Sequence, residues 1–333
     1  MNKSSAIING CWQLAQGHTF SRTSTHVTDL FFNYIEAGLT TFDCADIYCG
    51  VEEHLGQLRR EASSQGIDIT VHTKYVPNKD ALADLTFQCV EKAIVSSCEK
   101  LATETLDLVQ FHWWDYARGD YLQVLEWLTV LKDKGLIKEI GLTNFNGTHL
   151  RRILQHGISI YSIQTQYSFL DKRLEKEVFQ LAQTNAIKIF CYGVLAGGFF
   201  SINWLNQPEP TFQTLKNRSL IKYLLIIQEY GGWNKFQALL RTLHKISEQV
   251  QCSISEVVVL YFIKYTKIDA VILGIRLTFE RNPLNQLKLF SLTTEEKNDI
   301  QNYFDFVLAG DIYDLERNSE RHASIMKYNL NKE

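Results

Sequence analysis

The sequence predicts an α/β protein of the (β/α)8, or TIM barrel, class, folded as a single domain over residues 1–333. Three observations lead to this prediction: eight short apolar segments, amphipathic helical segments between them, and the length of the chain. A barrel of this class takes about 250 residues and is often longer. Two domains of about 150 residues each are the alternative by length alone, but no flexible linker and no internal repeat divides the sequence.

The eight apolar segments are rich in β-branched residues and are too short to be helices of ordinary length. They are mostly continuous rather than alternating in polarity, which is typical of parallel strands that are covered on both faces. The expected strands are Ala6–Gly10, Thr41–Tyr48, Ile69–Val76, Leu106–Trp113, Ile137–Phe145, Tyr161–Ser168, Ile187–Leu195 and Ala270–Arg276.

Segments with helical periodicity separate these strands. Within Tyr121–Lys134, four leucines recur every three residues and define one apolar face, and Gly135 follows as a stop signal. Leu174–Thr184 carries a similar apolar stripe. Ser253 and Thr293 each precede a glutamate by three residues, which is the capping-box signature of a helix start. This alternation of strands and helices favours a parallel barrel.

The spacing of the strands is irregular at one place. The seventh and eighth expected strands begin 83 residues apart, at Ile187 and Ala270, and residues 203–250 between them carry extra helical segments around Gly231 and Gly232. The rival architecture is an open, doubly wound sheet. Such a sheet predicts a G-x-G-x-x-G turn after the first strand, and the sequence has none there.

Composition excludes several classes of protein. Lys and Arg number 34 against 37 for Asp and Glu, a net charge of −3, so the basic surface expected of a nucleic-acid-binding protein is missing. No apolar run approaches the roughly 18 residues of a membrane span, and the N-terminal apolar stretch is too short for a signal peptide. Seven cysteines with scattered spacing indicate reduced thiols, a cytoplasmic location and no structural metal site.

Four residues able to take part in acid–base chemistry stand at or just after the ends of neighbouring expected strands. Asp43 and Tyr48 belong to the second strand segment, Lys74 to the third and His112 to the fourth. In a parallel barrel the carboxyl ends of the strands surround one mouth, where catalytic groups lie. We therefore expect these four side chains to meet.

The combination suits the reduction of a carbonyl group. A free tyrosine has a pKa of about 10, and the ammonium of Lys74 should lower the pKa of Tyr48, while Asp43 keeps Lys74 charged. His112 can hydrogen-bond a carbonyl oxygen. None of these side chains carries a hydride, so a nicotinamide cofactor is implied. A weaker alternative is a lyase or isomerase in which Lys74 forms a Schiff base.

These four residues resemble the catalytic tetrad of the aldo-keto reductase superfamily, whose members are NADPH-preferring (β/α)8 oxidoreductases. Further segments are similar to family motifs across nearly the whole chain. They are Thr41–Glu53 (TFDxAxxYG.E), Gly141–Phe145 (GLSNF, with Thr143 in place of Ser), Gln164–Ser168 (QxxYS) and Tyr192–Gly198 (YxPLxxG, with Val194 in place of Pro).

The resemblance implies a role for each matched residue. Tyr48 would be the general acid, tuned by Lys74 and Asp43, and His112 would orient the carbonyl group. Asn144 and Gln166 would hydrogen-bond the nicotinamide carboxamide, with Tyr192 stacked on the nicotinamide ring, and Thr143 would also belong to the cofactor site. Gly193 and Leu195 would lie in the loop over the pyrophosphate.

The adenosine end of the cofactor is expected beyond the eighth strand. The resemblance assigns Gly274 to this region and makes Arg276 the candidate for the 2′-phosphate that distinguishes NADP from NAD, because a guanidinium matches phosphate geometry. Either Asn282 or Asn285 is the counterpart of the family's adenine-binding asparagine; Asn285 is the first choice.

The sequence thus predicts NADP(H)-dependent reduction of a small aldehyde or ketone, or the reverse oxidation, with no metal, no nucleic acid and no membrane. A regulatory subunit that holds the cofactor and turns over slowly is the rival function. Trp113 and Trp114 either shape the substrate pocket or fill space behind the strand, and His72 is expected to pack. The sequence predicts neither the physiological substrate nor the oligomeric state.

Overall fold

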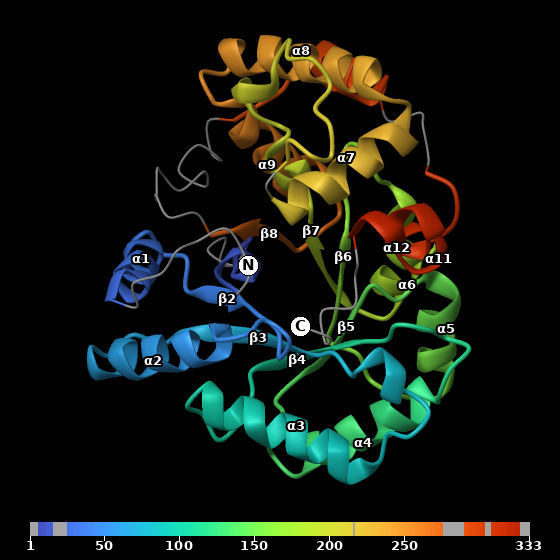
Figure 1. Ribbon diagram of the computed structural model, residues 1–333. Helices are drawn as coiled ribbons and strands as arrows, with labels where there is room; N and C mark the ends of the chain where they lie inside the picture. The colour runs from blue at the N-terminus through green and yellow to red at the C-terminus, as the bar shows by residue number, and fades with distance from the viewer. Residues whose placement is uncertain (1–5, 16–24, 216, 276–289, 304–307, 327–333) are drawn as a thin grey trace.

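The computed structural model describes residues 6–15, 25–215, 217–275, 290–303 and 308–326. Its eight strands are parallel and close into a barrel in chain order, with the first strand paired to the last. Figure 1 shows this ring of strands surrounded by helices. The strands are β1 (Ile7–Gly10), β2 (Thr41–Asp43), β3 (Thr70–Tyr75), β4 (Leu108–His112), β5 (Ile140–Thr143), β6 (Ser162–Gln166), β7 (Lys188–Tyr192) and β8 (Ala270–Gly274). The (β/α)8 prediction is confirmed.

The strands are shorter than predicted, mainly at their carboxyl ends. The expected strand Thr41–Tyr48 ends at Asp43, because the chain then turns and the backbone N–H of Tyr48 bonds the carbonyl of Ala45. The backbone N–H groups of Cys44 and Asp46 still donate to carbonyls of β3. The prediction was too long because apolar residues continue past the end of β2 into the turn that leads to Tyr48.

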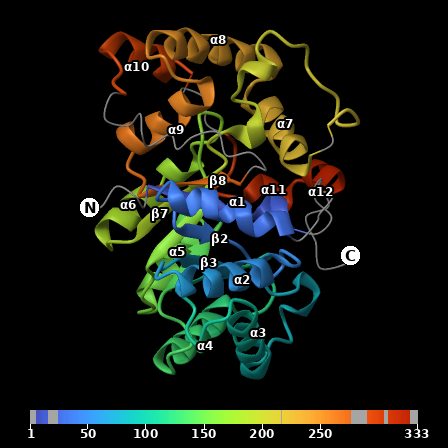
Figure 2. The same ribbon diagram turned by 90° about the vertical axis from the view of Figure 1, so that its left-hand side faces the viewer.

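Helices cover the outside of the barrel (Figures 1 and 2). The first six are α1 (Thr25–Glu36), α2 (Val51–Ser64), α3 (Phe87–Lys100), α4 (Tyr121–Asp133), α5 (Gly147–Gln155) and α6 (Val178–Thr184). In α4 the predicted stripe of leucines is buried. Burying such a face against the strands is what stabilises a short helix in a protein, because isolated helices of this length are marginal in water.

The extra helices predicted between the seventh and eighth strands are present as α7 (Arg218–Tyr230) and α8 (Trp233–Gln249). After α9 (Ile254–Tyr265) and β8 come α10 (Thr294–Gln301), α11 (Asp314–Asn318) and α12 (Glu320–Met326). Both predicted capping boxes form, at Ser253 and Thr293. In the described part of the chain, no single helix passes the length and hydropathy test for a membrane span, although α8 and α9 pass it as a pair bent by 89°.

The interior of the barrel has an apolar part and a polar part. Ile8, Leu108, Phe190, Ala270 and Ile272 form a small cluster that is separate from the main core between strands and helices. Since side chains alternate along a strand, residues two and four positions after Leu108 also face inward. These are Gln110 and His112, and the polar part leads towards the mouth of the barrel.

Candidate active site

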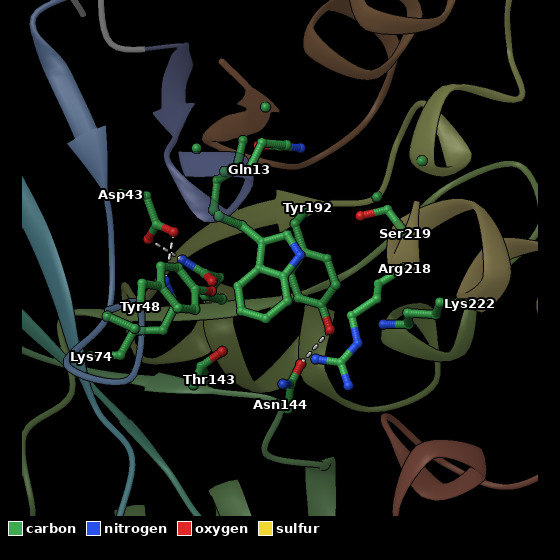
Figure 3. Close-up of a pocket in the computed structure, with 18 of the residues that line it drawn as sticks. Gln13, Asp43, Tyr48, Lys74, Thr143, Asn144, Tyr192, Arg218, Ser219 and Lys222 are labelled. Carbon is green, nitrogen blue, oxygen red and sulfur yellow. Dashed lines mark hydrogen bonds and ion pairs between the residues drawn. The ribbon is translucent and has the colours of Figure 1, made fainter. Parts of the chain in front are cut away.

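A cavity of about 660 Å³ opens at the carboxyl ends of the strands. Every predicted site residue that the structure describes lines it, with the exception of Gln166. These residues are Asp43, Tyr48, Lys74, His112, Thr143, Asn144, Tyr192, Gly193, Leu195 and Gly274. Figure 3 shows Asp43, Tyr48 and Lys74 on one side of the cavity and Arg218, Ser219 and Lys222 on the other, with Tyr192 between them.

Asp43 and Lys74 form a buried ion pair at the base of the cavity. The Nζ of Lys74 lies 2.5 Å from Oδ2 of Asp43 and also donates to the carbonyl oxygen of Cys44 at 2.7 Å. Burial acts to lower the pKa of Lys74, but the facing carboxylate of Asp43, together with Tyr48 and Cys44, outweighs burial, so that the pKa of Lys74 lies above its ordinary value. Because a Schiff base requires a neutral amine, this pair disfavours the lyase alternative.

Tyr48 lies against this pair. The Lys74 ammonium is 5.3 Å from the centroid of the Tyr48 ring, and Trp12 packs on the ring edge-to-face at 4.7 Å. Burial raises the pKa of Tyr48 to about 12, although Lys74 acts to lower it. The expected effect of Lys74 is therefore present but is smaller than that of burial. Tyr48 is consequently a neutral phenol at physiological pH, with a proton to donate.

His112 ends β4 beside the cavity. Its Nδ1 lies 3.3 Å from the carbonyl oxygen of Thr143, and its Nε2 has no hydrogen-bond partner among the described residues. Burial, reinforced by the charge of Arg317, lowers the pKa of His112 to about 3. The imidazole is therefore neutral. Trp114 packs against it at 4.5 Å, so the neighbourhood of His112 is largely aromatic.

The residues matched to the nicotinamide site lie at the ends of β5 and β7. The hydroxyl of Tyr192 donates to Oδ1 of Asn144 at 2.7 Å. Asn144 has a φ of 61°, a left-handed conformation that asparagine tolerates better than most residues. Gly193 has a φ of 84°, and a Cβ there would approach the hydroxyl oxygen of Tyr223 to 2.1 Å. Only glycine fits this close approach.

Gln166 is the predicted site residue that the structure describes but that does not line the cavity. Its amide donates to Oδ2 of Asp171 at 2.6 Å, in the turn that follows β6. Gln164, two positions earlier, lines the cavity and is in register with Thr143 of β5. Because side chains alternate along a strand, both glutamines face the same side of β6, and the hydrogen bond to Asp171 is what engages the Gln166 amide.

The remaining predictions concern the adenosine end of the cofactor. Arg276, Asn282 and Asn285 lie outside the described residues. Gly274 lines the cavity at the end of β8, where a Cβ would come within 2.2 Å of the Gln13 amide.

Three polar residues of α7 line the cavity without having been singled out from the sequence: Arg218, Ser219 and Lys222. Arg218 and Lys222 are four residues apart, so they share one face of the helix. The Nζ of Lys222 lies 5.1 Å from the ring centroid of Tyr192 and 3.6 Å from Oε1 of the buried Glu316. Burial lowers the pKa of Lys222.

The C-terminal segment closes another side of the cavity. Tyr313 and Met326 line it, and the ring of Tyr313 is 5.7 Å from that of His112. Arg317 on α11 donates to the carbonyl oxygens of Trp113 and Asn144, each at 3.0 Å. The ends of β4 and β5 are thus held by a residue that lies far away in the sequence.

The open questions about three aromatic residues are also answered. Trp113 is completely buried and packs against Phe111, whereas Trp114 lines the cavity. His72 stacks on Phe190 inside the barrel at 5.4 Å, as the packing interpretation predicted.

Comparison with known proteins agrees with this geometry. The model of the aldo/keto reductase family matches residues 6–303. The chain belongs to this family. The resemblance predicted from the sequence is therefore confirmed.

Individual relatives match shorter parts of the chain than the family model does. Over 164 residues the chain is 31% identical to flagellar radial spoke protein 5 of Chlamydomonas reinhardtii, covering 44% of this chain and 31% of that protein. Over 129 residues it is 27% identical to the NADH-specific methylglyoxal reductase of Escherichia coli, covering 38% of this chain and 39% of that protein. The chain thus matches well under half the length of each of these two relatives.

Among solved structures, the aldose reductase from Schistosoma japonicum superposes with a TM-score of 0.65 at 18% identity, covering 95% of this chain and 93% of that one. At this level of identity the likeness concerns the fold.

Proposed function

We propose that the protein reduces a small aldehyde or ketone to an alcohol with NADPH, or catalyses the reverse oxidation, in the cytoplasm. The observation that carries the proposal is the meeting of Asp43, Tyr48, Lys74 and His112 at one cavity. They come from three strands of the barrel and the turn after β2, and their burial and pairing leave a neutral phenol beside a charged ammonium.

The residues present fit a nicotinamide dinucleotide. The cavity volume is in the range of about 300–1,000 Å³ that is usual for ligand sites. Tyr192 offers an aromatic face, Asn144 and Gln164 offer amides, and Gly193 allows close backbone approach. Arg218 offers positive charge for the phosphate groups. When bound, the cofactor supplies the hydride.

The chain itself supplies the proton. The Oη of Tyr48 would donate its proton to the carbonyl oxygen as negative charge develops there. The ammonium of Lys74 would stabilise the resulting phenolate, and Asp43 would hold that ammonium in place. His112, through Nε2, would orient the reacting oxygen. The aromatic walls, including Trp12 and Trp114, would exclude water from the reacting atoms.

The choice of NADPH over NADH rests on Arg276 and on the family resemblance. Since the E. coli relative is named as NADH-specific, both cofactors belong in the test. We expect tighter binding of NADPH, measured as quenching of protein fluorescence during titration. Equal affinity for the two cofactors would contradict the assignment of a 2′-phosphate site.

The function is tested by following NADPH consumption with a panel of small aliphatic and aromatic aldehydes and ketones. We expect many turnovers per protein molecule with at least one of them. Tight binding of NADPH without turnover across the panel, in either direction, would overturn the proposal.

The second candidate is a subunit that holds the cofactor and acts mainly within an assembly. It is favoured by the relative whose name places it in the flagellar radial spoke. Under this alternative, NADPH binds tightly, no compound of the panel is turned over, and the protein co-purifies with a partner in stoichiometric amount.

A further inference from the structure

Two glutamines lie inside the barrel, and the mechanism above uses Gln164 only as an amide offered to the cofactor and Gln110 not at all. Gln110 is on β4, two residues before His112, and Gln164 is on β6. Gln110 has no exposed surface and Gln164 only 3%. Apolar side chains face the same interior: Leu108 lies two residues before Gln110 on β4, and Phe190 on β7 is in register with Gln164. An apolar residue would satisfy packing at this level, so a buried amide needs another explanation.

Both amides are directed at the same carboxylate oxygen. The Nε2 of Gln110 lies 2.9 Å from Oδ1 of Asp43, and the Nε2 of Gln164 lies 2.7 Å from that same atom. The Nε2 of Gln164 is also 2.9 Å from Oε1 of Gln110. The other oxygen of Asp43, Oδ2, faces Lys74. The two oxygens of the Asp43 carboxylate therefore have different hydrogen-bond partners: the two amides at Oδ1 and Lys74 at Oδ2.

A buried ion pair requires such support. Removing a carboxylate and an ammonium from water costs more than their attraction returns, unless further hydrogen bonds satisfy them. Asp43 is 4% exposed and Lys74 is 6% exposed, so water contributes little. Two amide donors on Oδ1 stabilise the ionised carboxylate. They also fix its rotation, which keeps Oδ2 directed at Lys74.

We propose that Gln110 is a positioning residue for the reaction: with Gln164, it holds Asp43 ionised and oriented, so that Lys74 stays against Tyr48. The inference rests on the proposed function, because Tyr48 is the proton donor there. Gln164 lines the cavity and can also meet a ligand, whereas Gln110 is not among the lining residues. Gln110 therefore acts through Asp43, and it is the residue to test.

The first variant is Gln110→Leu, which keeps the volume and removes the donor. We expect turnover to fall about ten- to hundredfold, the effect of losing a hydrogen bond to a charged group, with NADPH affinity unchanged. The matched control is Leu108→Val, two residues earlier on the same strand and also facing inward. It creates a small void without touching Asp43, and we expect its turnover to stay close to that of the wild type.

The second variant, Gln110→Glu, separates positioning from packing. A carboxyl group placed beside Asp43 shares a proton with it, because two adjacent carboxylates do not both ionise readily. The protonated form donates as the amide does. We therefore expect Gln110→Glu to be more active than Gln110→Leu near neutral pH and to lose activity through a new step as pH rises.

The new step can be assigned because the other ionisable groups near Asp43 are unchanged. Among the described residues these are Lys74 and His72 on β3, Tyr48 after β2 and Cys11 after β1. A wild-type rate in Gln110→Leu would overturn the proposal. So would Gln110→Glu being less active than Gln110→Leu at every pH, which is the result expected of a purely packing role.

A readout without turnover keeps this inference separate from the proposed function. If the wild type turns over no carbonyl compound, the proposed function fails, and melting temperatures still test Gln110. The amide of Gln110 stabilises the fold through Asp43, so Gln110→Leu should lower the melting temperature clearly in the wild type and much less in the Asp43→Leu/Lys74→Met background. Leu108→Val, which does not touch Asp43, should cost the same in both backgrounds. An equal loss for Gln110→Leu in the two backgrounds would refute the role of Gln110.

Discussion

The two sides of the cavity are built differently. On the side of β2 to β4, Asp43, Lys74 and His112 stand on neighbouring strands, and Tyr48 lies in the turn directly after β2. On the opposite side, Arg218 and Lys222 come from α7, and Tyr313 comes from the segment before α11. Figure 3 shows Arg218, Ser219 and Lys222 of α7 across the cavity from Tyr48 and Asp43.

The difference lies in what holds each side in place. The proposed catalytic side is held by the strand pairing and by a buried ion pair whose partners, Asp43 and Lys74, stand on the neighbouring strands β2 and β3. The other side depends on long-range pairs: Arg173 after β6 and Lys222 on α7 both meet Glu316 on α11. We therefore expect changes on the catalytic side to affect chemistry and stability, and changes on the α7 side to affect cofactor binding.

The largest effect is expected for Tyr48→Phe. Removing the proton donor should lower turnover by about a thousandfold, within the range typical of general acid catalysis. The affinity for NADPH, measured by fluorescence titration, should stay unchanged, because the ring remains. Tyr121→Phe, which alters a hydroxyl bonded to His149 outside the cavity, serves as the control. Wild-type turnover in Tyr48→Phe would show that Tyr48 is not the proton donor.

Next comes the loss of the ion pair. Lys74→Met leaves the Asp43 carboxylate buried without its partner, and breaking a buried pair in this way costs about 3–5 kcal/mol. The variant should be inactive and should unfold at a clearly lower denaturant concentration. The double variant Asp43→Leu/Lys74→Met should regain much of the stability but none of the activity. If both variants unfold like the wild type, the pair is not structural.

On the opposite side the expected pattern is reversed. Arg218→Met should weaken NADPH binding by about tenfold, the value of one charge-assisted contact, and make it less sensitive to salt, while turnover at saturating cofactor stays near that of the wild type. Arg321→Met, which removes an exposed pair with Glu229, is the matched control. A fall in turnover at saturating NADPH, with unchanged affinity, would erase the distinction between the two sides.

The smallest effect concerns pH and stability. Burial lowers the pKa of His72 to about 4, so the folded protein keeps this ring neutral while the unfolded chain takes up a proton near pH 6.5. Stability should therefore fall as pH decreases from about 7 to 4. In His72→Phe, which can keep the stack on Phe190, the melting temperature should depend less on pH over this range. An identical slope in the two proteins would contradict the buried neutral state.

Much of the proposed catalytic side could be predicted because strands and turns depend on residues that are close together in the sequence. The apolar runs located all eight strands, and the short offsets from strand ends located Asp43, Lys74 and His112. The same reasoning missed the hydrogen bond that engages the Gln166 amide with Asp171, so that Gln164 lines the cavity instead. It also missed the arrival of Arg218 and Tyr313 at the mouth.

The sequence by itself thus determined the order of strands and helices and the residue types at the strand ends, because periodicity and strand spacing are properties of neighbouring residues. Only the tertiary structure decided the protonation of Tyr48 and the pairing of Gln110 with Asp43. Burial and hydrogen bonds between distant segments arise when the barrel closes. Their strength depends on the exclusion of water, which no local pattern of residues records.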